Sequence, residues 1–421
     1  MKRGWPFCTS IAVSRRGSNW YIPNCSLNSF KLPSINPHLI GYLAFDYTCT
    51  DFLCLYLFTK QPAQYIMQGE VMNIFAIETS CDETAVAVVQ DGRRVLSSEL
   101  FSQADMHAVY GGVVPEIASR NHIAAIGRLC ELALENAGIS KRDIDAVAVT
   151  YAPGLIGALL VGVNFAKGLA LALDIPLIPV HHIRGHIAAN YIAYPKLEPP
   201  FLCLVVSGGN SLIADVSGYT DISVVGRSRD DAAGECFDKV ARVLGLGYPG
   251  GPALDKLAQN GDDMRYSLPH PVIDGFPYDM SFSGLKTAIV NLVHNAKQKG
   301  IPLDAASLAA SFTRTVSDII VPRTMAAAVE LGHGKIAVAG GVAANSLIRA
   351  DFLKAAKANK RTLMLAPPNL CGDNAAMIGC QGYYEFLAGV RADMSLDARA
   401  TLDVHLHYHT GQECGNYNVT K

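Results

Sequence analysis

The chain has 421 residues, of which 50% are hydrophobic and 17% are charged, and its formal net charge is −2. This composition excludes an intrinsically disordered protein, and the length is sufficient for two domains. The small net charge excludes a global positive field, so a nucleic-acid partner would require a local basic patch or a helper protein. The eleven cysteines are scattered without zinc-like CxxC spacing, which is typical of a protein from the reducing cytoplasm.

Residues 1–71 differ in composition from the remainder of the chain. They hold both tryptophans, and six Lys/Arg stand against three Asp/Glu. Residues 39–58 are apolar enough to suggest a membrane span, but Asp46 and Asp51 interrupt them, and charges are costly in hydrocarbon. We therefore expect no membrane partner. Met72 opens a strand-like segment, so we expect native translation to start there and residues 1–71 to be a misassigned leader or a disordered extension.

From Met72 onward the apolar pattern is regular and predicts a first α/β lobe over residues 72–200. Strands are predicted at 72–78, 84–90 and 95–102, with the polar turn Thr-Ser-Cys-Asp-Glu after the first. A helix at 115–138 ending at Gly138, a strand within 143–154, a helix at 155–173 and a strand at 176–180 follow.

The same scheme restarts at Phe201 and predicts a second α/β lobe over residues 201–400, followed by a tail at 401–421. Strands are expected at 201–206, 211–217 and 221–228, and helices at 232–245, 251–260, 283–297 and 308–331. Two strand–turn–helix units follow at 335–358 and 362–389. Because both lobes open with a strand, a polar turn and a second strand, the sequence predicts an internal repeat of topology.

Glycine-rich turns occupy corresponding places in the second lobe. The segment Ser207–Gly209 follows a strand, and Gly340–Gly341 lie between a strand and a helix start. Backbone amides in such turns can approach an anion closely. Each glycine pair alone is equally consistent with a tight structural turn, but together they predict a nucleotide site between the lobes. A P-loop is excluded because the sequence lacks GxxxxGK[ST].

The segment from Val180 to His186 contains three histidines directly after a strand. On a helix, His182 and His186 share one face, and Asp373, expected from the opposite lobe, begins another helix. Two imidazoles and one carboxylate form an open triad suited to iron(II) or zinc, although a solvated or core histidine pair is the alternative. His181 is expected to support or pack. A metalloprotease is disfavoured because Ile183, rather than the Glu of HExxH, follows the first histidine.

The ordered motifs ETSCDET, YGGVVPEIASR, VHHIRGH, VSGGN, DDAAGECFDK, SFSGLKT, AGGVAAN and GDNAAM resemble those of the bacterial TsaD family, the tRNA adenosine threonylcarbamoyltransferases, from Met72 to about Ala400. The resemblance implies an actin-like, sugar-kinase-like (ASKHA) fold with two duplicated RNase H-like α/β lobes. It implies transfer of a threonylcarbamoyl group from threonylcarbamoyl-adenylate to the N6 amine of adenosine thirty-seven, in tRNAs that read codons beginning with A. TsaB-like and TsaE-like proteins are the implied partners.

The resemblance also implies roles for particular residues. His182, His186 and Asp373 match the family's metal ligands, with Fe²⁺ the first expectation and Zn²⁺ the second. Further matches are implied substrate contacts: Val205, Val206, Ser207, Gly208, Gly209, Asp238, Gly251, Asp255 and Asn345. For the aspartates, capping or solvation remains the alternative, and Asn345 is also a natural helix N-cap. Asp82 and Glu83 are candidate proton acceptors, or residues of a polar turn.

Two departures from the family pattern and three basic clusters complete the expectations. Asn210 and Arg184 stand where the family often has His and Glu, and Arg184 is expected to add positive charge near the metal for an anionic donor or tRNA. The basic clusters lie at 93–94, 227–229 and 354–361, and each is also consistent with a solvated face. The tail is expected to be solvated. The alternatives to a transferase are an ATP-dependent kinase or ATPase of the same fold, and a non-catalytic scaffold.

Overall fold

The computed structural model describes residues 14–16, 19–21 and 71–408. By contacts, the chain divides into residues 1–59 and residues 60–421. Within the first unit, β1 (Ser14–Arg16) pairs antiparallel with β2 (Asn19–Tyr21). The apolar stretch 39–58 and most of the tail, residues 409–421, lie outside the described residues. The translation start expected at Met72 remains a prediction.

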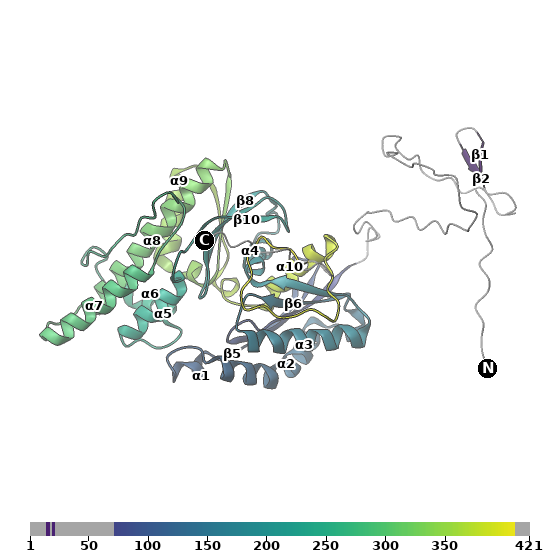
Figure 1. Cartoon of the computed structure of the whole chain (residues 1–421), viewed down its shortest axis with the longest axis horizontal. Coiled ribbons are helices and arrows are strands. Elements are labelled where there is room, and N and C mark those ends of the chain that lie inside the picture. Colours follow the sequence, from purple (N-terminus) through teal and green to yellow (C-terminus); the bar gives the residue numbers. More distant parts are fainter. Residues whose placement is uncertain (1–13, 17–18, 22–70, 409–421) are drawn as a thin grey trace, which may run out of the picture. The chain divides into compact units, whose positions relative to one another are not determined.

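The first sheet has five strands in the order β5-β4-β3-β6-β7. β3 pairs antiparallel with β4 and β4 with β5, whereas β3, β6 and β7 run parallel (Figure 1). The strands are β3 (Asn73–Glu78), β4 (Glu83–Gln90), β5 (Arg94–Ser102), β6 (Ala146–Ala152) and β7 (Leu177–His181). The predicted strands of the first lobe are therefore confirmed.

The second sheet repeats this arrangement in the order β10-β9-β8-β11-β12. Two antiparallel pairings are again followed by two parallel ones. The strands are β8 (Phe201–Val206), β9 (Ser211–Val216), β10 (Ile222–Arg227), β11 (Lys335–Ala339) and β12 (Thr362–Leu365). The repeat of topology predicted from the sequence is thus present. How the lobe boundaries divide the chain remains a prediction.

The helices form between these strands where the apolar periodicity predicts them. α2 begins with Pro115 at its first turn and ends at Gly138, whose left-handed conformation (φ 69°) suits glycine. The helices are α1 (Ala104–Ala108), α2 (Pro115–Ala137), α3 (Ile156–Leu173), α4 (His182–Ala193), α5 (Ala233–Val243), α6 (Gly250–Ala258), α7 (Ser283–Lys299), α8 (Ala305–Glu330), α9 (Ser346–Ala358) and α10 (Ala375–Leu387), with 3₁₀ turns at Lys141–Asp143, Gly341–Ala344 and Pro368–Leu370. The five-residue α1 has no counterpart in the sequence prediction.

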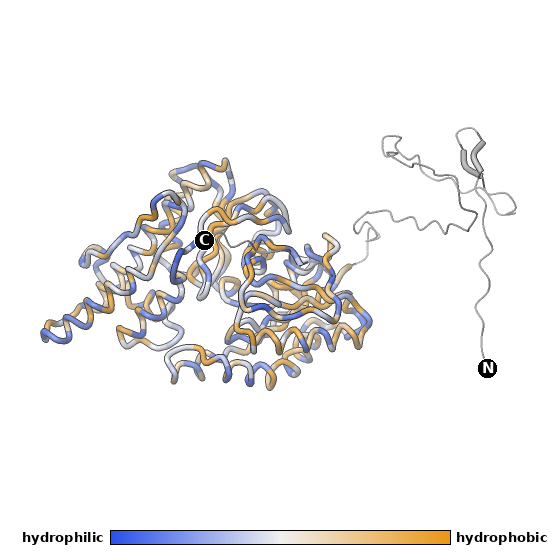
Figure 2. The backbone as a smooth tube through the Cα atoms, in the orientation of Figure 1, coloured by the Kyte–Doolittle hydropathy of each residue, from blue (hydrophilic) through white to orange (hydrophobic). Residues whose placement is uncertain are grey.

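Each sheet is covered on its outer face by helices of its own stretch of chain. α2 and α3 pack on the first sheet, with Phe75, Val147 and Leu159 in their shared core. The second sheet packs with α5, α8 and α9 through Leu204, Phe312 and Val338, among others. Figure 2 shows the apolar colour running through both sheets. Burial of these apolar faces is the main contribution to stability.

The inner faces are covered by two helices that exchange places. α4 follows β7 of the first sheet, yet it packs on β8 and β11 of the second. α10 follows β12 of the second sheet, yet it packs on β3 and β4 of the first, and α4 and α10 contact each other. Small residues permit this closeness, because a Cβ at Gly379 would lie 2.6 Å from Val89 Cγ2 and one at Gly185 would lie 2.7 Å from Ile378 Cδ1. Asp373 lies in the stretch 201–400, as expected, but the helix that it introduces packs on the first sheet.

α3 is the one helix of the described residues that is long and apolar enough to cross a membrane. Length and composition alone do not distinguish such a span from a helix of a soluble core, and α3 packs on β6 and α2.

Two of the cations considered for ligand contact make hydrogen bonds within the protein. Arg184 is buried, donates to Glu385 Oε1 at 2.9 Å and donates through Nε to the Val404 carbonyl at 2.9 Å. Arg93 donates to Tyr384 Oη at 2.7 Å and to the carbonyls of Pro195 and Leu197. The ligand-facing role expected of Arg184 is therefore wrong, whereas Arg93 is only partly buried and the basic cluster at 93–94 stays a prediction.

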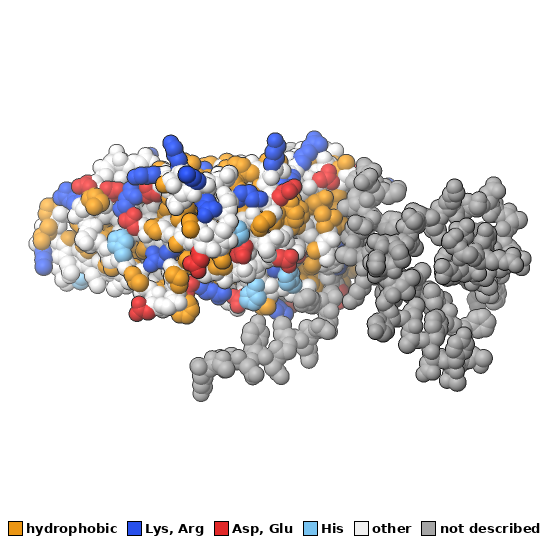
Figure 3. Space-filling view, turned by 90° about the horizontal axis from the view of Figure 1, so that it is seen from above, with side chains coloured by type: hydrophobic (Ala, Val, Ile, Leu, Met, Phe, Trp, Pro, Cys, Tyr) orange, Lys and Arg blue, Asp and Glu red, His pale blue; other side chains and the backbone are white. Residues whose placement is uncertain are grey.

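The start of the tail also packs against the protein. Val404 is buried at 3% exposure, and the Tyr408 ring lies edge-on to Tyr151, with 5.8 Å between ring centroids. The prediction of a solvated tail is therefore wrong for this part. On the face that Figure 3 shows, basic and acidic side chains are interspersed, in keeping with the small net charge.

Candidate active site

His181 forms the N-cap of α4. Its Nδ1 accepts a hydrogen bond from the N–H of Ile183 at 3.2 Å, so Nε2 carries the proton and donates to the Leu402 carbonyl at 3.1 Å. Burial lowers the pKa of this imidazole to about 3, which keeps it neutral. Both ring nitrogens are thus engaged in structural hydrogen bonds.

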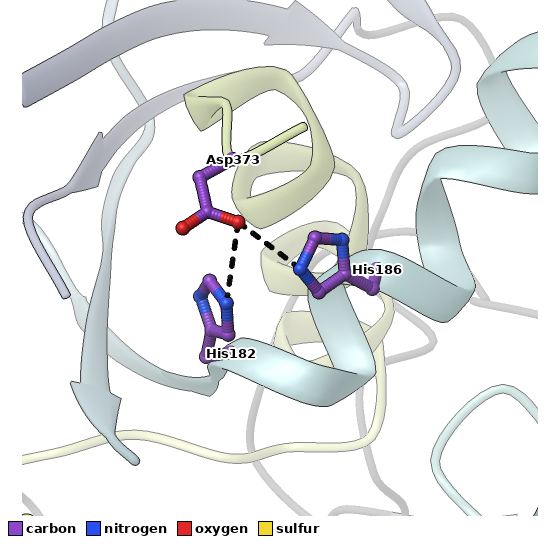
Figure 4. Close-up of side chains that lie close together, drawn as sticks. All are labelled: His182, His186 and Asp373. Atoms are coloured by element: carbon purple, nitrogen blue, oxygen red, sulfur yellow. Dashed lines mark ion pairs between the residues drawn. The ribbon is translucent and has the colours of Figure 1, made fainter. Parts of the chain in front are cut away.

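His182 and His186 lie one turn apart on α4 and converge on Asp373, the residue before the N-cap of α10 (Figure 4). Asp373 Oδ1 lies 3.5 Å from His182 Nε2 and 3.1 Å from His186 Nε2. Both imidazoles are buried, whereas the Asp373 side chain is 22% exposed. The structure therefore brings the three predicted ligands together at the contact between the two exchanged helices.

The donor set fits a divalent cation. One ligand atom from each residue lies within 4.8 Å of the others. Bonds of about 2.1 Å in tetrahedral geometry place ligand atoms about 3.4 Å apart, close to the two separations between Asp373 Oδ1 and the histidine nitrogens. Moreover, Nε2 of His186 is buried and makes no hydrogen bond of good geometry among the described residues, although Asp373 Oδ1 lies 3.1 Å away. A cation held by both atoms would satisfy this nitrogen.

Glu78, at the end of β3, supports this cluster and was not singled out in the sequence. Its Oε2 lies 3.0 Å from Nδ1 of His182 and accepts a hydrogen bond from Thr150 Oγ1 at 2.6 Å. Burial works to raise the pKa of Glu78, but the charge and hydrogen bond of His182 outweigh it, so the pKa is lowered. The only signal in the sequence was an acidic residue ending an otherwise apolar strand.

The charges of the cluster reinforce one another. Burial works to raise the pKa of Asp373, but His182 and His186 outweigh it and lower the pKa. Burial works to lower the pKa of His182, but Asp373 and Glu78 raise it well above its ordinary value. The metal-free cluster therefore holds a proton that a cation would replace on binding.

Asp82 and Glu83 lie beside the cluster, in and directly after the polar turn between β3 and β4. Asp82 Oδ2 accepts a hydrogen bond from Tyr248 Oη at 3.0 Å, a contact that joins the first sheet's turn to the α5–α6 loop. Burial, followed by the charges of Asp373 and Asp82, raises the pKa of Glu83 to about 9. At neutral pH Glu83 is therefore protonated in the absence of a cation.

The Ser207–Gly209 turn is held between β8, α5 and the second glycine turn. Its backbone carbonyls at Ser207 and Gly208 accept from the N–H groups of Gly234 and Glu235 at 3.2 and 3.0 Å, at the start of α5. A Cβ at Gly340 would lie 2.3 Å from the Val206 carbonyl oxygen, so only glycine fits there. Val205, Val206 and Ser207 are buried, while Gly208 and Gly209 are exposed and free to meet a ligand.

Comparison with known proteins identifies the family of this chain. The sequence model of TsaD, tRNA N6-adenosine threonylcarbamoyltransferase, matches residues 94–380. A tRNA N6-adenosine threonylcarbamoyltransferase of Clostridium perfringens is 50% identical over 329 residues, covering 78% of this chain and 97% of that protein. One of Staphylococcus saprophyticus is 48% identical over 336 residues, covering 80% of this chain and 98% of that protein. The chain belongs to the TsaD family.

A solved HypF structure from T. kodakarensis aligns with this TsaD family member at a TM-score of 0.50 and 16% identity, covering 75% of this chain and 47% of the HypF chain. At such low identity the likeness concerns the fold alone. Together with two sheets of the same strand order, it confirms the predicted actin-like, two-lobed α/β fold class.

The remaining residues marked by the TsaD resemblance lie on the second lobe and make structural contacts. Asp238 accepts from the N–H of Gly250 at 2.8 Å, and burial raises its pKa. Asp255 accepts from Ser346 Oγ at 2.8 Å at the start of α9. A Cβ at Gly251 would meet nothing within 4 Å. Their substrate contacts remain predictions.

Asn345 is the N-cap of α9, the alternative that the sequence left open. Its Oδ1 accepts from the N–H of Ile348 at 3.1 Å. Its Nδ2, however, is buried with no partner among the described residues, so the amide retains a donor for a ligand. Capping and ligand contact are therefore compatible at this residue.

A cavity of ≈ 200 Å³ lies beside the glycine turn. It is bounded by residues of α4, β9, β10 and the chain's last described segment, and its lining includes His181, Gly209, Asn210, Arg227 and Asp403. None of the three clustered ligand residues lines it, so it is separate from the candidate metal centre.

Proposed function

We propose that this protein transfers the threonylcarbamoyl group of threonylcarbamoyl-adenylate to the N6 amine of adenosine thirty-seven in tRNAs that read codons beginning with A. The observation that carries the proposal is the convergence of His182, His186 and Asp373 in a chain that covers 97% of a relative named for this activity. A kinase of the same fold has no need of two histidines and a carboxylate at one point.

We propose that these three residues hold one divalent cation, with Fe²⁺ favoured and Zn²⁺ as the alternative. Two imidazoles and a carboxylate with open positions suit both ions. The bound cation would polarise oxygens of the acyl donor. Glu78, by holding Nδ1 of His182, keeps Nε2 directed at the cation.

The exposed Gly208 and Gly209 amides are proposed to bind the phosphate of the adenylate, because glycine lets the backbone approach an anion. Val205, Val206 and Ser207, which lead into this turn, are proposed to contact the same substrate. Asp238 and Asp255 are proposed to accept hydrogen bonds from ribose hydroxyls, Gly251 to leave space for the nucleoside, and Asn345 to donate through its free Nδ2.

The proposed reaction exchanges one bond for another. The adenosine N6 attacks the carbamoyl carbon, the N–C bond forms, and the C–O bond to phosphate breaks so that AMP leaves with the electron pair. The nitrogen must also lose a proton. Asp82 and Glu83, in and directly after the turn beside the cluster, are the proposed acceptors.

The division into lobes at residues 72–200 and 201–400 belongs to the same proposal, as do TsaB-like and TsaE-like partners, a cytoplasmic location and the absence of a membrane partner. A protein with net charge −2 gains from helpers when it must bind tRNA.

Two linked experiments test the proposal. Cells depleted of the protein should lose threonylcarbamoyladenosine from their tRNA, as measured by nucleoside mass spectrometry. Purified protein with its partners, threonylcarbamoyl-adenylate and tRNA should restore it, whereas His186→Ala and Asp373→Ala should lose both bound metal and activity.

The matched control is His270→Ala, an exposed histidine whose side chain is 51% exposed and far along the second lobe. Unchanged modified nucleoside in depleted cells that have no second such gene would overturn the assignment. Full activity of both metal-ligand variants would overturn the role of the cluster.

A further inference from the structure

A short loop after α1 is tied to the polar turn that carries Asp82. The N–H of Gln103 donates to the Asp82 carbonyl at 3.2 Å, directly before α1. After α1, the chain is held by His107, whose carbonyl accepts from the N–H of Gly112 at 3.3 Å and whose Nδ1 accepts from the N–H of Val114 at 3.3 Å. Hydrogen bonds at both ends of α1 therefore connect the loop 109–114 to the polar turn beside the candidate metal centre.

The loop lies against a cation of the other lobe. Gly111 and Gly112 have φ values of 69° and 151°, in the region that favours glycine. A Cβ at Gly111 would lie 3.3 Å from Arg242 Nε, and one at Gly112 would lie 2.9 Å from Arg242 Nη2. The two glycines thus let the backbone rest on the guanidinium of α5, beside the contact between Asp82 and Tyr248.

This place combines exposed apolar, aromatic and cationic groups. Val109 is 84% exposed and Tyr110 is 60% exposed. Arg242 is exposed, and within the described residues no carboxylate forms an ion pair with it. Asp238, whose pKa burial raises and the charge of Arg242 acts to lower, accepts a hydrogen bond from the N–H of Gly250 and forms no ion pair with Arg242. We call Val109, Tyr110 and Arg242 the cleft-mouth surface.

We propose that the cleft-mouth surface binds the single-stranded anticodon loop of the substrate tRNA, with Tyr110 stacking on a base next to the acceptor adenosine and Arg242 contacting a phosphate. The proposal rests on the proposed function. Proteins recognise RNA loops by stacking unpaired bases on aromatic rings and pairing cations with the backbone. An exposed tyrosine beside an unpaired guanidinium, adjoining the turn of the proposed proton acceptor, supplies both interactions where the acceptor base must enter.

The first test measures binding of a fluorescently labelled anticodon stem-loop RNA to the full chain with its partner proteins. Tyr110→Ala should raise Kd about tenfold, the usual effect of removing one base-stacking ring. Tyr110→Phe, which keeps the ring, should bind as the wild type does. Arg242→Ala should weaken binding and reduce the slope of log K against log salt by about 0.7, the loss of one single-strand phosphate contact, and Arg242→Lys should restore part of it.

Lys297→Ala provides the matched control, because Lys297 is another exposed cation with no ion pair in the described part of the chain. It should change neither Kd nor the salt slope. Equal Kd values for the wild type and for both Tyr110→Ala and Arg242→Ala would overturn the proposal, as would effects of equal size at Lys297.

The second test separates stacking from folding. A stem-loop lacking the base on the 3′ side of the acceptor adenosine, and one lacking the base on the 5′ side, are compared on both proteins. If Tyr110 stacks on one of them, removal of that base should abolish the difference between the wild type and Tyr110→Ala, whereas a difference that persists with both RNAs would contradict stacking.

In turnover, the variants should raise KM for tRNA while leaving KM for threonylcarbamoyl-adenylate unchanged. A wild-type protein that forms no threonylcarbamoyladenosine would refute the proposed function. An active wild type with unaltered tRNA KM in Tyr110→Ala and Arg242→Ala would refute only the cleft-mouth surface, and loss of partner binding instead of RNA binding would assign that surface to a protein partner.

Discussion

Glu78 Oε2 lies 3.0 Å from Nδ1 of His182, and the opposite nitrogen of the same ring lies 3.5 Å from Asp373 Oδ1. The carboxylate therefore fixes which nitrogen of His182 is protonated and turns the other toward the candidate cation.

Glu78→Gln should weaken metal binding about 10- to 100-fold, because the amide keeps the shape of the carboxylate but loses its charge on His182. Metal content after dialysis against a graded chelator measures this directly. Glu131→Gln, at an exposed glutamate of α2, serves as the control and should retain the metal. Equal metal affinities of the Glu78→Gln variant and the wild type would show that Glu78 does not support the site.

Arg184→Ala should lower the free energy of unfolding by about 3 to 5 kcal/mol, the usual loss when one partner of a buried ion pair is removed. Among the described side chains, Gln381 alone would then donate to the buried Glu385, and the Val404 carbonyl would lose the Nε donor. Urea unfolding followed by circular dichroism measures the change. Arg120→Ala removes an exposed pair on α2 and should cost less than about 1 kcal/mol; similar losses for the two variants would contradict the buried role of Arg184.

His122 should make stability depend on pH on the acid side of neutrality. Burial lowers its pKa below 6.5, while its ring bonds Thr84 Oγ1 at 2.7 Å and the Cys81 carbonyl at 2.9 Å. Below about pH 6.5 the unfolded chain binds a proton at His122 more readily than the folded chain does. The contribution of neutral His122 to the free energy of unfolding is therefore complete above about pH 6.5 and is lost as the pH falls toward the folded pKa.

Unfolding free energies measured at intervals between about pH 5 and 8 should decline toward acid in the wild type and decline less steeply in His122→Gln. His270→Gln, at an exposed imidazole, should keep the wild-type slope. Parallel curves of unfolding free energy against pH for all three proteins would show that His122 does not cause the loss of stability toward acid.

Gly340→Ala should destabilise the protein by about 1 to 3 kcal/mol and weaken adenylate binding. Gly340 has φ 91° and ψ 162°, a conformation essentially restricted to glycine, and a Cβ there would press on the Val206 carbonyl that supports the Ser207–Gly209 turn. Chemical denaturation and calorimetric titration with a non-reactive adenylate analogue measure the two effects. Gly334→Ala, where a Cβ meets nothing within 4 Å, should leave both unchanged.

The sequence predicted every strand of the two large sheets and most of the helices that cover them, because their apolar periods are regular. A helix at α4 was considered only as the condition under which His182 and His186 share a face. It also predicted that His182, His186 and Asp373 would meet, since residues that follow strand ends gather at one edge of an α/β sheet. α1 was not predicted, because five residues are too few to show a helical period of apolar side chains.

Other features depend on contacts between distant segments and could not be predicted. Glu78 meets His182 and Thr150 because β3, β6 and the start of α4 come together in the first lobe. Tyr248 meets Asp82 across the two lobes. The hydrogen bonds of Arg93 and the burial of Arg184 depend on carbonyls contributed by residues far along the chain. The packing of α10 on the first sheet reverses what chain order suggests, because no local pattern records which sheet a helix will cover.

The exchange of α4 and α10 means that neither half of the chain completes its own interior. A fragment ending near residue 200 would expose the sheet face of Ile74, Val89 and Val180 that α10 normally shields, and would carry α4 with no second sheet to cover. The repeat visible in the strand order is thus not a pair of separable modules, because each half needs a helix of the other to cover its sheet.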